Sequence, residues 1–536
     1  MAPWFTSEQD GLAKFDVAVR STSPKSRVTF GPGVSMGQEL VRKTEAFDLV
    51  YNNGTCGTLE LLDGCAFTNR LIAAYNANQS AAVYQRGGDV YLTNGGSNDG
   101  HMGYGGYCFY EKTGGAMRIR AWTRFGFTRS GAGIFHGTSD WQSDSSSLAF
   151  SAGGTGILYQ TSGKLSALGT EDGALAICNA NYATAWGGLG VVTVRGPDAC
   201  VYVKNDAFYM SDCSISKSFV NMLDGGTMQV AQLRKQGEKT YRTGNDISNA
   251  YAYVNFDGGV LKSTGKNANL FGAGAKAPDR VTVFSRGAII DSDAYAVTNN
   301  AALQAPTGKG VASIALPEGF DATGYIGPPV VSISGDGTGA TAVCEYDTTN
   351  QVVTGITVTS PGWDYTEATA TLSRGGKSGV IACTVTLADN DATGGLTKRG
   401  AGTLVLSEAN TYGGATRLEG GTLVLAHAQG YPGGNLEIPA AIVRGSFSAP
   451  LLTANSLTFA AGKGVRVTEA DTLEETTFGG LRTVATFAEP IAVPSLTLVD
   501  SDGSEMLPHG VWHLLLLDGG RTLKFGALRG TQILIR

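Results

Sequence analysis

The sequence predicts an all-β protein built as a right-handed parallel β-helix, a solenoid in which short strands of successive coils stack on one another. Three observations support this prediction: abundant glycine, short alternating stretches, and repeats spaced by about one coil. Glycine accounts for 76 of the 536 residues, and charged residues make up only 16% of the chain. Soluble domains average ~7% glycine and ~25% charged residues. The chain therefore needs many turns and few helices.

A double glycine followed by alternating residues recurs along the chain. Glycine reaches the positive-φ conformation of tight turns at low cost, and the alternation after it places side chains on opposite faces of a strand. Each copy predicts a turn that leads into a short strand. Such a strand buries only one small face, so its stability must come from the next copy stacked on it. The copies are 87–92, 114–119, 225–230 and 420–425, with looser ones at 258–261 and 519–523.

Longer alignments set the length of one coil. Residues 84–90 align without gaps with residues 159–165, which lie 75 positions further on. Three coils of about 25 residues explain that distance. Near the C-terminus, the sequence of residues 403–406 recurs at 422–425, 19 positions later. Spacings of this size fit coils whose strands stack at ~4.8 Å, whereas a propeller would repeat nearer ~40 residues.

One segment departs from this coil length and predicts an insertion. Residues 330–334 resemble residues 369–373, and Cys344 stands 39 residues before Cys383. We interpret this segment as a two-copy β module, with 317–323 as its leading linker. The expected segments are an N-terminal cap at 1–30, β-helix coils at 31–316, the inserted module at 317–388, further coils at 389–470, and C-terminal β coils with a cap at 471–536.

The two ends of a β-helix expose unpaired backbone groups, so terminal caps are expected. In the C-terminal segment, the four consecutive leucines at 514–517 predict a strand that is buried on both faces.

Residues 394–425 carry the most specific motif of the chain. They contain GGLTKRGAGTLVL, then NTYGGAT, then GGTLVL. This stretch resembles the passenger-associated transport repeat of bacterial autotransporters. Residues 254–262 and 287–291 also resemble sequences of large proteins that carry that repeat, so the clearest resemblance covers roughly 220–430. It implies a secreted β-helical passenger at the bacterial cell surface, and it implies no activity. The first residues, MAPWFTSEQDGL, lack the apolar region of a secretory signal, so we expect the export signal to be absent from this chain.

Composition argues against several classes of function. A formal net charge of −6 without a basic stripe argues against nucleic acid as a partner. No apolar run approaches the ~18 residues that a membrane-spanning helix needs. The eight cysteines include no CxxC pair, and the five histidines leave little room for a zinc site or a catalytic triad. We therefore expect no cofactor, no metal and a non-enzymatic role.

The richest mixture of aromatic and charged side chains lies between residues 99 and 144. Aromatic rings stack on sugar faces, and arginine and aspartate bind sugar hydroxyls and carboxylates. The segment is therefore a candidate glycan-binding surface, although aromatic ladders along β-helix coils produce the same composition. The candidate residues are His101, Tyr104, Tyr107, Arg118, Arg120, Trp122, Arg124, His136, Asp140 and Trp141.

Three smaller features have ordinary structural interpretations. The glycine-rich turn at 334–339 lacks the Gly-Lys-Ser/Thr ending of a phosphate loop, so a structural turn is favoured. The acidic stretches 291–293 and 500–502 are typical of turns rather than of calcium sites. Cys178 and Cys200 lie 22 residues apart, which would let them stack on neighbouring coils, as buried thiols more readily than as a disulfide.

These observations favour an exported, surface-displayed β-helical passenger, an adhesin-like structural or binding protein. Its expected partners are extracellular glycans, a host surface or other copies of itself. One alternative is a polysaccharide-degrading β-helix enzyme, a lyase or hydrolase, with a groove near residues 101–141. No paired carboxylates with glycosidase spacing stand out in the sequence. Another alternative is a protein like a phage tailspike, which trimerisation in solution would favour.

Overall fold

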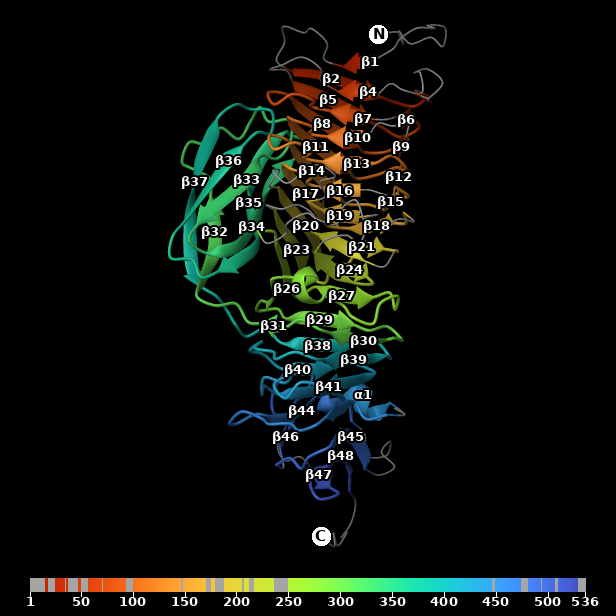
Figure 1. Ribbon diagram of the computed structural model, residues 1–536, viewed down its shortest axis with the longest axis vertical. Coiled ribbons are helices and arrows are strands. Elements are labelled where there is room, and N and C mark those ends of the chain that lie inside the picture. The colour runs from red at the N-terminus through yellow and green to blue at the C-terminus, as the bar shows by residue number, and fades with distance from the viewer. Residues whose placement is uncertain are drawn as a thin grey trace. The chain divides into compact units, whose positions relative to one another are not determined.

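Stacked parallel strands make up most of the chain, and the predicted β-helix is confirmed (Figure 1). Among the residues that the structure describes, strands account for 54% and helices for 3%. The chain divides into unit 1 (1–255, 274–279 and 306–390) and unit 2 (256–273, 280–305 and 391–536). The computed structural model describes residues 15–17, 25–33, 35–36, 47–49, 56–69, 71–92, 100–145, 148–169, 175–178, 188–204, 207–211, 216–235, 249–445, 449–473, 481–492, 494–506 and 510–528.

In unit 1, each coil contributes one strand to each of three parallel sheets, here named A, B and C. Sheet A comprises β1 (Phe15–Val17), β4 (Phe47–Leu49), β7 (Leu71–Ala73), β10 (Gly100–Met102), β13 (Thr123–Phe125), β16 (Leu148–Phe150), β19 (Leu175–Ile177), β22 (Phe208–Met210) and β25 (Leu233–Lys235). Sheet B comprises β2 (Lys25–Phe30), β5 (Cys56–Leu61), β8 (Ser80–Gln85), β11 (Tyr107–Lys112), β14 (Ala132–Gly137), β17 (Thr155–Gln160), β20 (Leu189–Arg195), β23 (Lys217–Leu223) and β26 (Tyr251–Asp257). Sheet C comprises β3 (Ser35–Met36), β6 (Ala66–Asn69), β9 (Asp89–Leu92), β12 (Met117–Ile119), β15 (Trp141–Ser143), β18 (Gly163–Ala167), β21 (Ala199–Val203) and β24 (Thr227–Val230).

The register of sheet B confirms the coil length inferred from the sequence. Tyr84, Glu111, His136 and Tyr159 occupy the same position in four successive strands. The aligned segments 84–90 and 159–165 are therefore three coils apart. Of the expected cap at 1–30, the structure describes residues 15–17 and 25–30, which belong to parallel strands β1 and β2.

Aromatic rings from all three sheets fill the interior of unit 1. Phe125 of sheet A stacks on Phe150 of the next coil, with ring centroids 4.9 Å apart, and meets Phe135 of sheet B edge-on at 5.6 Å. Trp141 of sheet C stacks on Phe135 at 4.3 Å and is only 3% exposed. Pairs of this kind add about 0.5–1.5 kcal/mol each beyond their burial. These residues define which side of each strand faces the interior.

Buried polar side chains satisfy the glycine turns between sheets B and C. Gln85 Nε2 donates to the carbonyl of Gly88 at 3.1 Å, and Lys112 Nζ donates to the carbonyl of Gly115 at 2.8 Å. Two coils after Lys112, Gln160 has the same role and donates to the carbonyl of Ser162 at 2.6 Å. All three donor side chains are fully buried. Because buried carbonyls need partners, these three side chains stabilise the turns of their own coils.

The inserted module consists of antiparallel strands and belongs to unit 1. The segments 330–334 and 369–373, which resemble each other in sequence, pair with each other, with Val331 opposite Leu372. The chain enters and leaves the module side by side, since Lys309 pairs with Asp389. The strands are β32 (Lys309–Ala315), β37 (Val380–Asp389), β36 (Ala368–Ser373) and β33 (Val330–Gly335) in one sheet, and β34 (Thr338–Asp347) with β35 (Val352–Trp363) in a hairpin.

The module covers the outer face of sheet B, and its strands lie beside β8 to β23 in Figure 1. Because Phe135 points inward, its neighbour Ile134 points outward, and strand register extends this outward position to the other coils. The resulting outer column is apolar and buried against Ile326, Val330, Val343 and Trp363 of the module. Its members are Phe109, Ile134, Ile157, Val191 and Phe219.

Polar contacts fix the module on sheet B. Tyr107 Oη donates to the carbonyl of Pro328 at 2.8 Å, and Asn221 Nδ2 donates to Thr341 Oγ1 at 3.0 Å. Tyr107 is fully buried, and burial raises the pKa of its phenol well above the usual value, so it stays a hydrogen-bond donor.

Substituting Tyr107→Phe should weaken the docking of the module by about 1 kcal/mol, because the carbonyl of Pro328 loses a donor while the ring remains. Hydrogen exchange of residues 306–390 should rise in this variant. The matched control is Tyr110→Phe, which removes a hydroxyl that contacts Gln85 inside the solenoid. If both variants change the exchange of the module equally, the hydroxyl of Tyr107 has no specific part in docking.

Unit 2 is also built from parallel strands, arranged mainly in two sheets. One sheet holds β27 (Val260–Ser263), β29 (Ala288–Asp291), β38 (Leu396–Arg399), β40 (Thr416–Leu418), β42 (Leu436–Pro439), β44 (Gly464–Thr468) and β46 (Ser495–Leu498). The other holds β30 (Ala296–Asn299), β39 (Thr403–Leu406), β41 (Thr422–Leu425), β43 (Leu452–Ala454), β45 (Arg482–Phe487), β48 (Thr522–Ala527) and β47 (Trp512–Leu517), and β28 (Arg280–Val283) pairs with β31 (Leu303–Gln304). The helical elements of the described residues are η1 (Gly274–Lys276) in unit 1, and α1 (Ala440–Arg444) and η2 (Ala470–Thr472) in unit 2.

Two pairings in unit 2 explain sequence features. β39 pairs with β41 residue for residue, so the TLVL sequence that occurs twice marks one coil. β29 pairs directly with β38 although residues 292–395 lie between them in sequence. The strands before and after the inserted module are therefore hydrogen-bonded neighbours in this sheet.

The prediction that the four leucines at 514–517 form a strand buried on both faces is wrong. All four side chains are only partly buried. β47 is the outermost strand of its sheet and pairs antiparallel with β48, its one neighbour in the sheet order. A strand at a sheet edge has fewer neighbours to cover its faces, which explains the remaining exposure.

Candidate binding site

The structure distributes the ten candidate residues from the sequence over three sheets that face different directions. A segment of this length winds around the whole solenoid, so these side chains do not meet in one groove. His101, Tyr104, Trp122 and Arg124 lie in or next to sheet A, Tyr107 and His136 in sheet B, and Arg118, Arg120, Asp140 and Trp141 in or next to sheet C.

The sheet A group forms an aromatic ladder outside the solenoid. The rings of His101 and Tyr104 have centroids 4.9 Å apart, and each packs against Phe127 at 4.6 and 4.9 Å. The guanidinium of Arg124 lies 5.2 Å from the centroid of Phe127, and Arg124 is only 1% exposed. Tyr75, which is 44% exposed, stacks on Tyr104 at 4.4 Å. Most side chains of this group are packed against one another, so a sugar would contact mainly Tyr75 and Tyr104.

The remaining candidates are engaged in local contacts. Arg118 and Arg120 flank Asp144. Partial burial alone would raise the pKa of Asp144, but hydrogen bonds and the charges of both arginines bring that pKa below its usual value. His136 stacks on Tyr159 at 5.3 Å, with its Nε2 3.1 Å from Thr161 Oγ1.

The last two members of the group are also occupied. Asp140 accepts the backbone N–H of Lys164 at 2.8 Å, and Trp141 lies inside the solenoid, where its indole N–H donates to Gln160 at 3.0 Å. The glycan-binding role of the ten residues stays a prediction.

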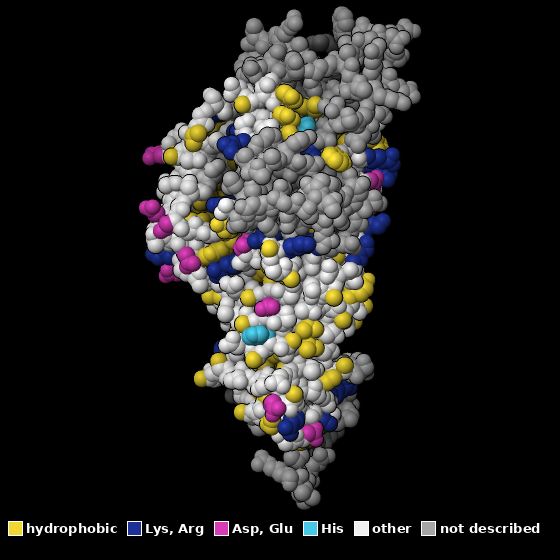
Figure 2. Space-filling view, in the orientation of Figure 1, with side chains coloured by type: hydrophobic (Ala, Val, Ile, Leu, Met, Phe, Trp, Pro, Cys, Tyr) yellow, Lys and Arg dark blue, Asp and Glu magenta, His cyan; other side chains and the backbone are white. Residues whose placement is uncertain are grey.

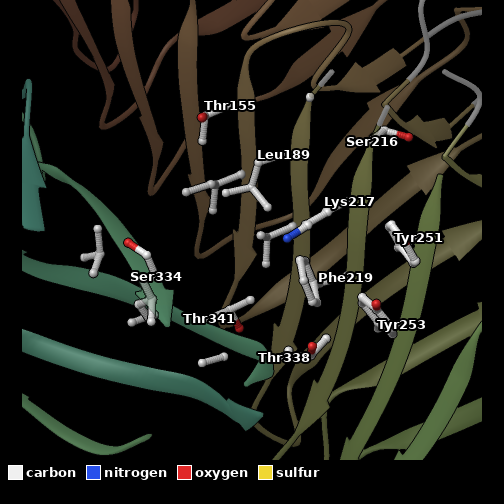
Figure 3. Close-up of a pocket in the computed structure, with 18 of the residues that line it drawn as sticks. Thr155, Leu189, Ser216, Lys217, Phe219, Tyr251, Tyr253, Ser334, Thr338 and Thr341 are labelled. Carbon is white, nitrogen blue, oxygen red and sulfur yellow. The ribbon is translucent and has the colours of Figure 1, made fainter. Parts of the chain in front are cut away.

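A cleft of about 740 Å³ lies between sheet B and the module, and the sequence did not point to it (Figure 3). One wall is the column of side chains at the start of the sheet B strands, which includes Thr155, Leu189 and Lys217 in register. The floor is the apolar outer column of sheet B, and the other wall is formed by β33, β34 and the turn between them. The described lining residues are Arg129, Gly153, Gly154, Thr155, Ile157, Gly188, Leu189, Val191, Ser216, Lys217, Phe219, Asn249, Tyr251, Tyr253, Val331, Ile333, Ser334, Gly335, Gly337, Thr338, Gly339, Ala340, Thr341, Ala342 and Tyr365.

A pair of tyrosines forms a flat aromatic surface in this cleft. Tyr251 is 40% exposed and its ring is nearly parallel to that of Tyr253, with an interplanar angle of 9° and centroids 6.2 Å apart. Tyr253 is held by Phe219 at 5.3 Å and by the edge of Trp363 at 5.4 Å. Burial raises the pKa of Tyr253 to about 12, so its phenol is neutral at physiological pH. The sheet alternation and the module together fix the orientation of these rings.

The turn at 334–339 forms the opposite wall and is a structural turn, as the sequence favours. The carboxylate of Asp336 accepts the N–H groups of Thr366 and Glu367, both at 3.0 Å, and also the hydroxyl of Thr366. A side chain at Gly337 would meet the ring of Tyr365 at 2.4 Å, which explains why glycine is needed there. The hydrogen bond from the hydroxyl of Thr366, with those from both backbone N–H groups, holds the pKa of Asp336 at about 2.

The turn should loosen on acidification, because its folded-state pKa lies below that of an unfolded aspartate, ~3.9. The stabilisation is present above pH ~4 and is lost as the pH falls toward 2. Hydrogen exchange at Thr366 and Glu367 should become less protected over this range. In Asp336→Asn, protection should already be reduced at pH 7, and the pH dependence should vanish. An unchanged pH dependence in that variant would contradict the assignment.

The cysteine and aspartate features have structural roles. Cys178 follows β19 in sheet A, whereas Cys200 lies in β21 of sheet C between Lys164 and Thr227, so the prediction that these cysteines stack on neighbouring coils is wrong. Asp291 accepts the N–H of Asp293 at 2.8 Å, which is the geometry of an ordinary turn.

Within the described residues, no group of three or more His, Cys, Asp or Glu side chains could hold a metal ion. Helices in this part of the chain are all too short or too polar to cross a membrane. The lining residues of the cleft supply cations, hydroxyls and aromatic rings. Such a set is suited to binding a polar ligand.

The fold defines a parallel β-helix with a laterally docked accessory module. Residues 396–425 match the family model of the passenger-associated transport repeat. The chain thus carries the repeat of autotransporter passengers, and the resemblance identified in the sequence is confirmed. The match covers β38 to β41, two stacked coils of unit 2. Comparisons with curated proteins and with solved structures gave no match.

Proposed function

We propose that the protein is an exported autotransporter passenger that is displayed at the bacterial surface and binds an extracellular ligand, as an adhesin does. The match of residues 396–425 to the passenger-associated transport repeat is the observation that carries the proposal. In this proposal the coils provide a scaffold, and the cleft beside the module provides the binding site.

The strand pairing supports export. Among the described strands of unit 1, each coil strand of sheets A, B and C pairs with strands of the coils before and after it. A solenoid with such nearest-neighbour contacts can fold by adding coils one at a time. This property suits a chain that crosses an envelope unfolded and folds on the far side.

Surface labelling of intact cells tests the proposal. Cells that produce the native protein are treated with a membrane-impermeant amine reagent, and modified lysines are mapped by mass spectrometry. Exposed lysines such as Lys217 and Lys266 should be labelled, whereas a cytoplasmic marker protein should not. Labelling that appears only after lysis would refute surface display.

A polysaccharide lyase is the second candidate, because the cleft holds a cation, Lys217, and a phenol, Tyr251, on strands that are neighbours in sheet B. A lyase needs a base and a group that neutralises the substrate carboxylate. Incubation with uronate polymers should then produce unsaturated, ultraviolet-absorbing ends. A binding protein would release none.

A further inference from the structure

We infer that the ligand of the cleft between sheet B and the module is an acidic saccharide, with Lys217 as its charge partner and Tyr251 as its stacking surface. This inference rests on the proposed binding function and names the substrate class and the residues. The proposed site is this cleft, whose two walls face each other, rather than the dispersed candidate residues of 99–144.

Charge is the first argument. The described lining of the cleft includes two basic side chains, Lys217 and Arg129, both exposed, and no aspartate or glutamate. This contrasts with the chain as a whole, whose net charge is −6, and with the outer edge of the module, where Figure 2 shows acidic side chains gathered. A recess lined by one sign of charge attracts ligands of the opposite sign. The cleft therefore favours an anion.

The aromatic surface is the second argument. Tyr251 is one of the few large apolar side chains exposed in the described part of the chain. Its ring lies parallel to that of Tyr253, which is itself packed against Phe219 and Trp363. An exposed aromatic ring suits the apolar face of a pyranose. A free inorganic anion would make no use of this surface.

Hydroxyl groups on both walls are the third argument. Thr155 lies on the β-helix side, and Ser334 and Thr338 lie on the module side, as Figure 3 shows. In the same view the ammonium of Lys217 projects into the space between the two walls. Hydroxyls on the two walls of a recess can hydrogen-bond ring hydroxyls of a bound sugar. The volume of about 740 Å³ lies within the range of ~300–1,000 Å³ typical of ligand sites.

The test compares ligands that differ only in charge. Binding of the full chain to polygalacturonate, hyaluronate and a sialylated oligosaccharide is measured by calorimetry, and any acidic ligand found is paired with its methyl ester. We expect at least about tenfold weaker binding of the ester, and weaker binding of the acid as salt rises. Equal binding of acid and ester would overturn the inference. An acidic peptide that binds better than every saccharide would also overturn it.

Matched variants test the two residues. Lys217→Gln and Tyr251→Ala should each weaken binding of the acidic saccharide about tenfold or more. Lys217→Gln should also reduce the difference between acid and ester, whereas Tyr251→Ala should weaken both. The controls Lys266→Gln and Tyr91→Ala remove an exposed lysine and an exposed tyrosine that are not among the described lining residues, and they should bind as the parent does. Full binding by Lys217→Gln and Tyr251→Ala would refute the assignment.

The surface-labelling experiment separates this inference from the proposed function. A protein that is displayed on cells but binds no acidic saccharide would overturn the ligand assignment alone. A protein that stays inside the cell would overturn the proposed function, whatever it binds when purified.

Discussion

Replacing Lys398 by methionine should destabilise unit 2 by about 3–5 kcal/mol. The side chain is fully buried within the passenger repeat, and its ammonium donates to Ser292 Oγ at 3.0 Å. It also donates to the carbonyls of Arg399, Gly400 and Gly420 at 2.7, 2.7 and 3.0 Å. Methionine fills a similar volume but removes the ammonium donor from the carbonyls of Gly400 and Gly420, whereas the carbonyl of Arg399 still accepts the N–H of Ser292 at 3.1 Å. The cost of unsatisfied buried carbonyls, rather than a cavity, should dominate the loss.

Hydrogen exchange of peptides within 396–425 and denaturant unfolding measure this effect. Lys262→Met is the matched control, because Lys262 makes only partly exposed ion pairs, at 3.7 Å with Asp291 and 3.4 Å with Asp293. Such pairs contribute at most about 1 kcal/mol. If the two variants lose equal stability, the bonds of Lys398 to the turn carbonyls do not stabilise the repeat.

Removing the module should leave the coils folded but make the protein associate. The carbonyl of Gly308 accepts the N–H of Asn390 at 2.9 Å, so a short glycine linker can replace residues 309–389. The deletion bares the apolar outer column of sheet B, from Phe109 to Phe219, whose members are now 1–7% exposed. Each such side chain gains about 1.5–3 kcal/mol from burial. The shortened protein should therefore bury the column against another copy.

Light scattering, binding of a hydrophobic dye and circular dichroism check this result. The expected outcome is strand content that remains, with larger particles and increased dye binding. A second variant adds Ile134→Lys and Ile157→Glu to the deletion, because opposite charges on adjacent strands are tolerated on an exposed sheet. This variant should be monomeric. A deletion protein that is monomeric without those charges would contradict the prediction.

The solenoid was predictable because its determinants are local. Glycine turns and the alternation after them recur along the chain, and the alignment of 84–90 with 159–165 fixes the coil length. The passenger repeat was equally accessible, because its motif is continuous from 394 to 425. Both features depend on neighbouring residues and on the coil length alone.

The cleft was not predictable in the same way. Its described lining comes from residues 129–253 and 331–365, which the fold brings together only by docking the module. The candidates at 99–144 were grouped by sequence, but a stretch of that length passes around all three sheets. Residues that stack in a β-helix are instead one coil apart, as Thr155, Leu189 and Lys217 are. A search by coil position would have found this column.

The prediction that Cys178 and Cys200 stack on neighbouring coils failed for a different reason. Their separation is close to one coil, yet the length of the turns differs between coils, so equal separation does not mean equal position. Cys178 ends the sheet A part of one coil, and Cys200 has already reached sheet C of the next.

Because β29 pairs directly with β38, the coil ladder of unit 2 is complete without residues 306–390. The chain also leaves and rejoins this ladder through adjacent strands, β32 and β37. The free energy of closing a loop changes only slowly with loop length, so the ladder tolerates inserts of very different size. The position between β29 and β38 can therefore accept an inserted domain. A foreign domain with neighbouring termini could be carried there, provided that it brings an apolar face to cover sheet B.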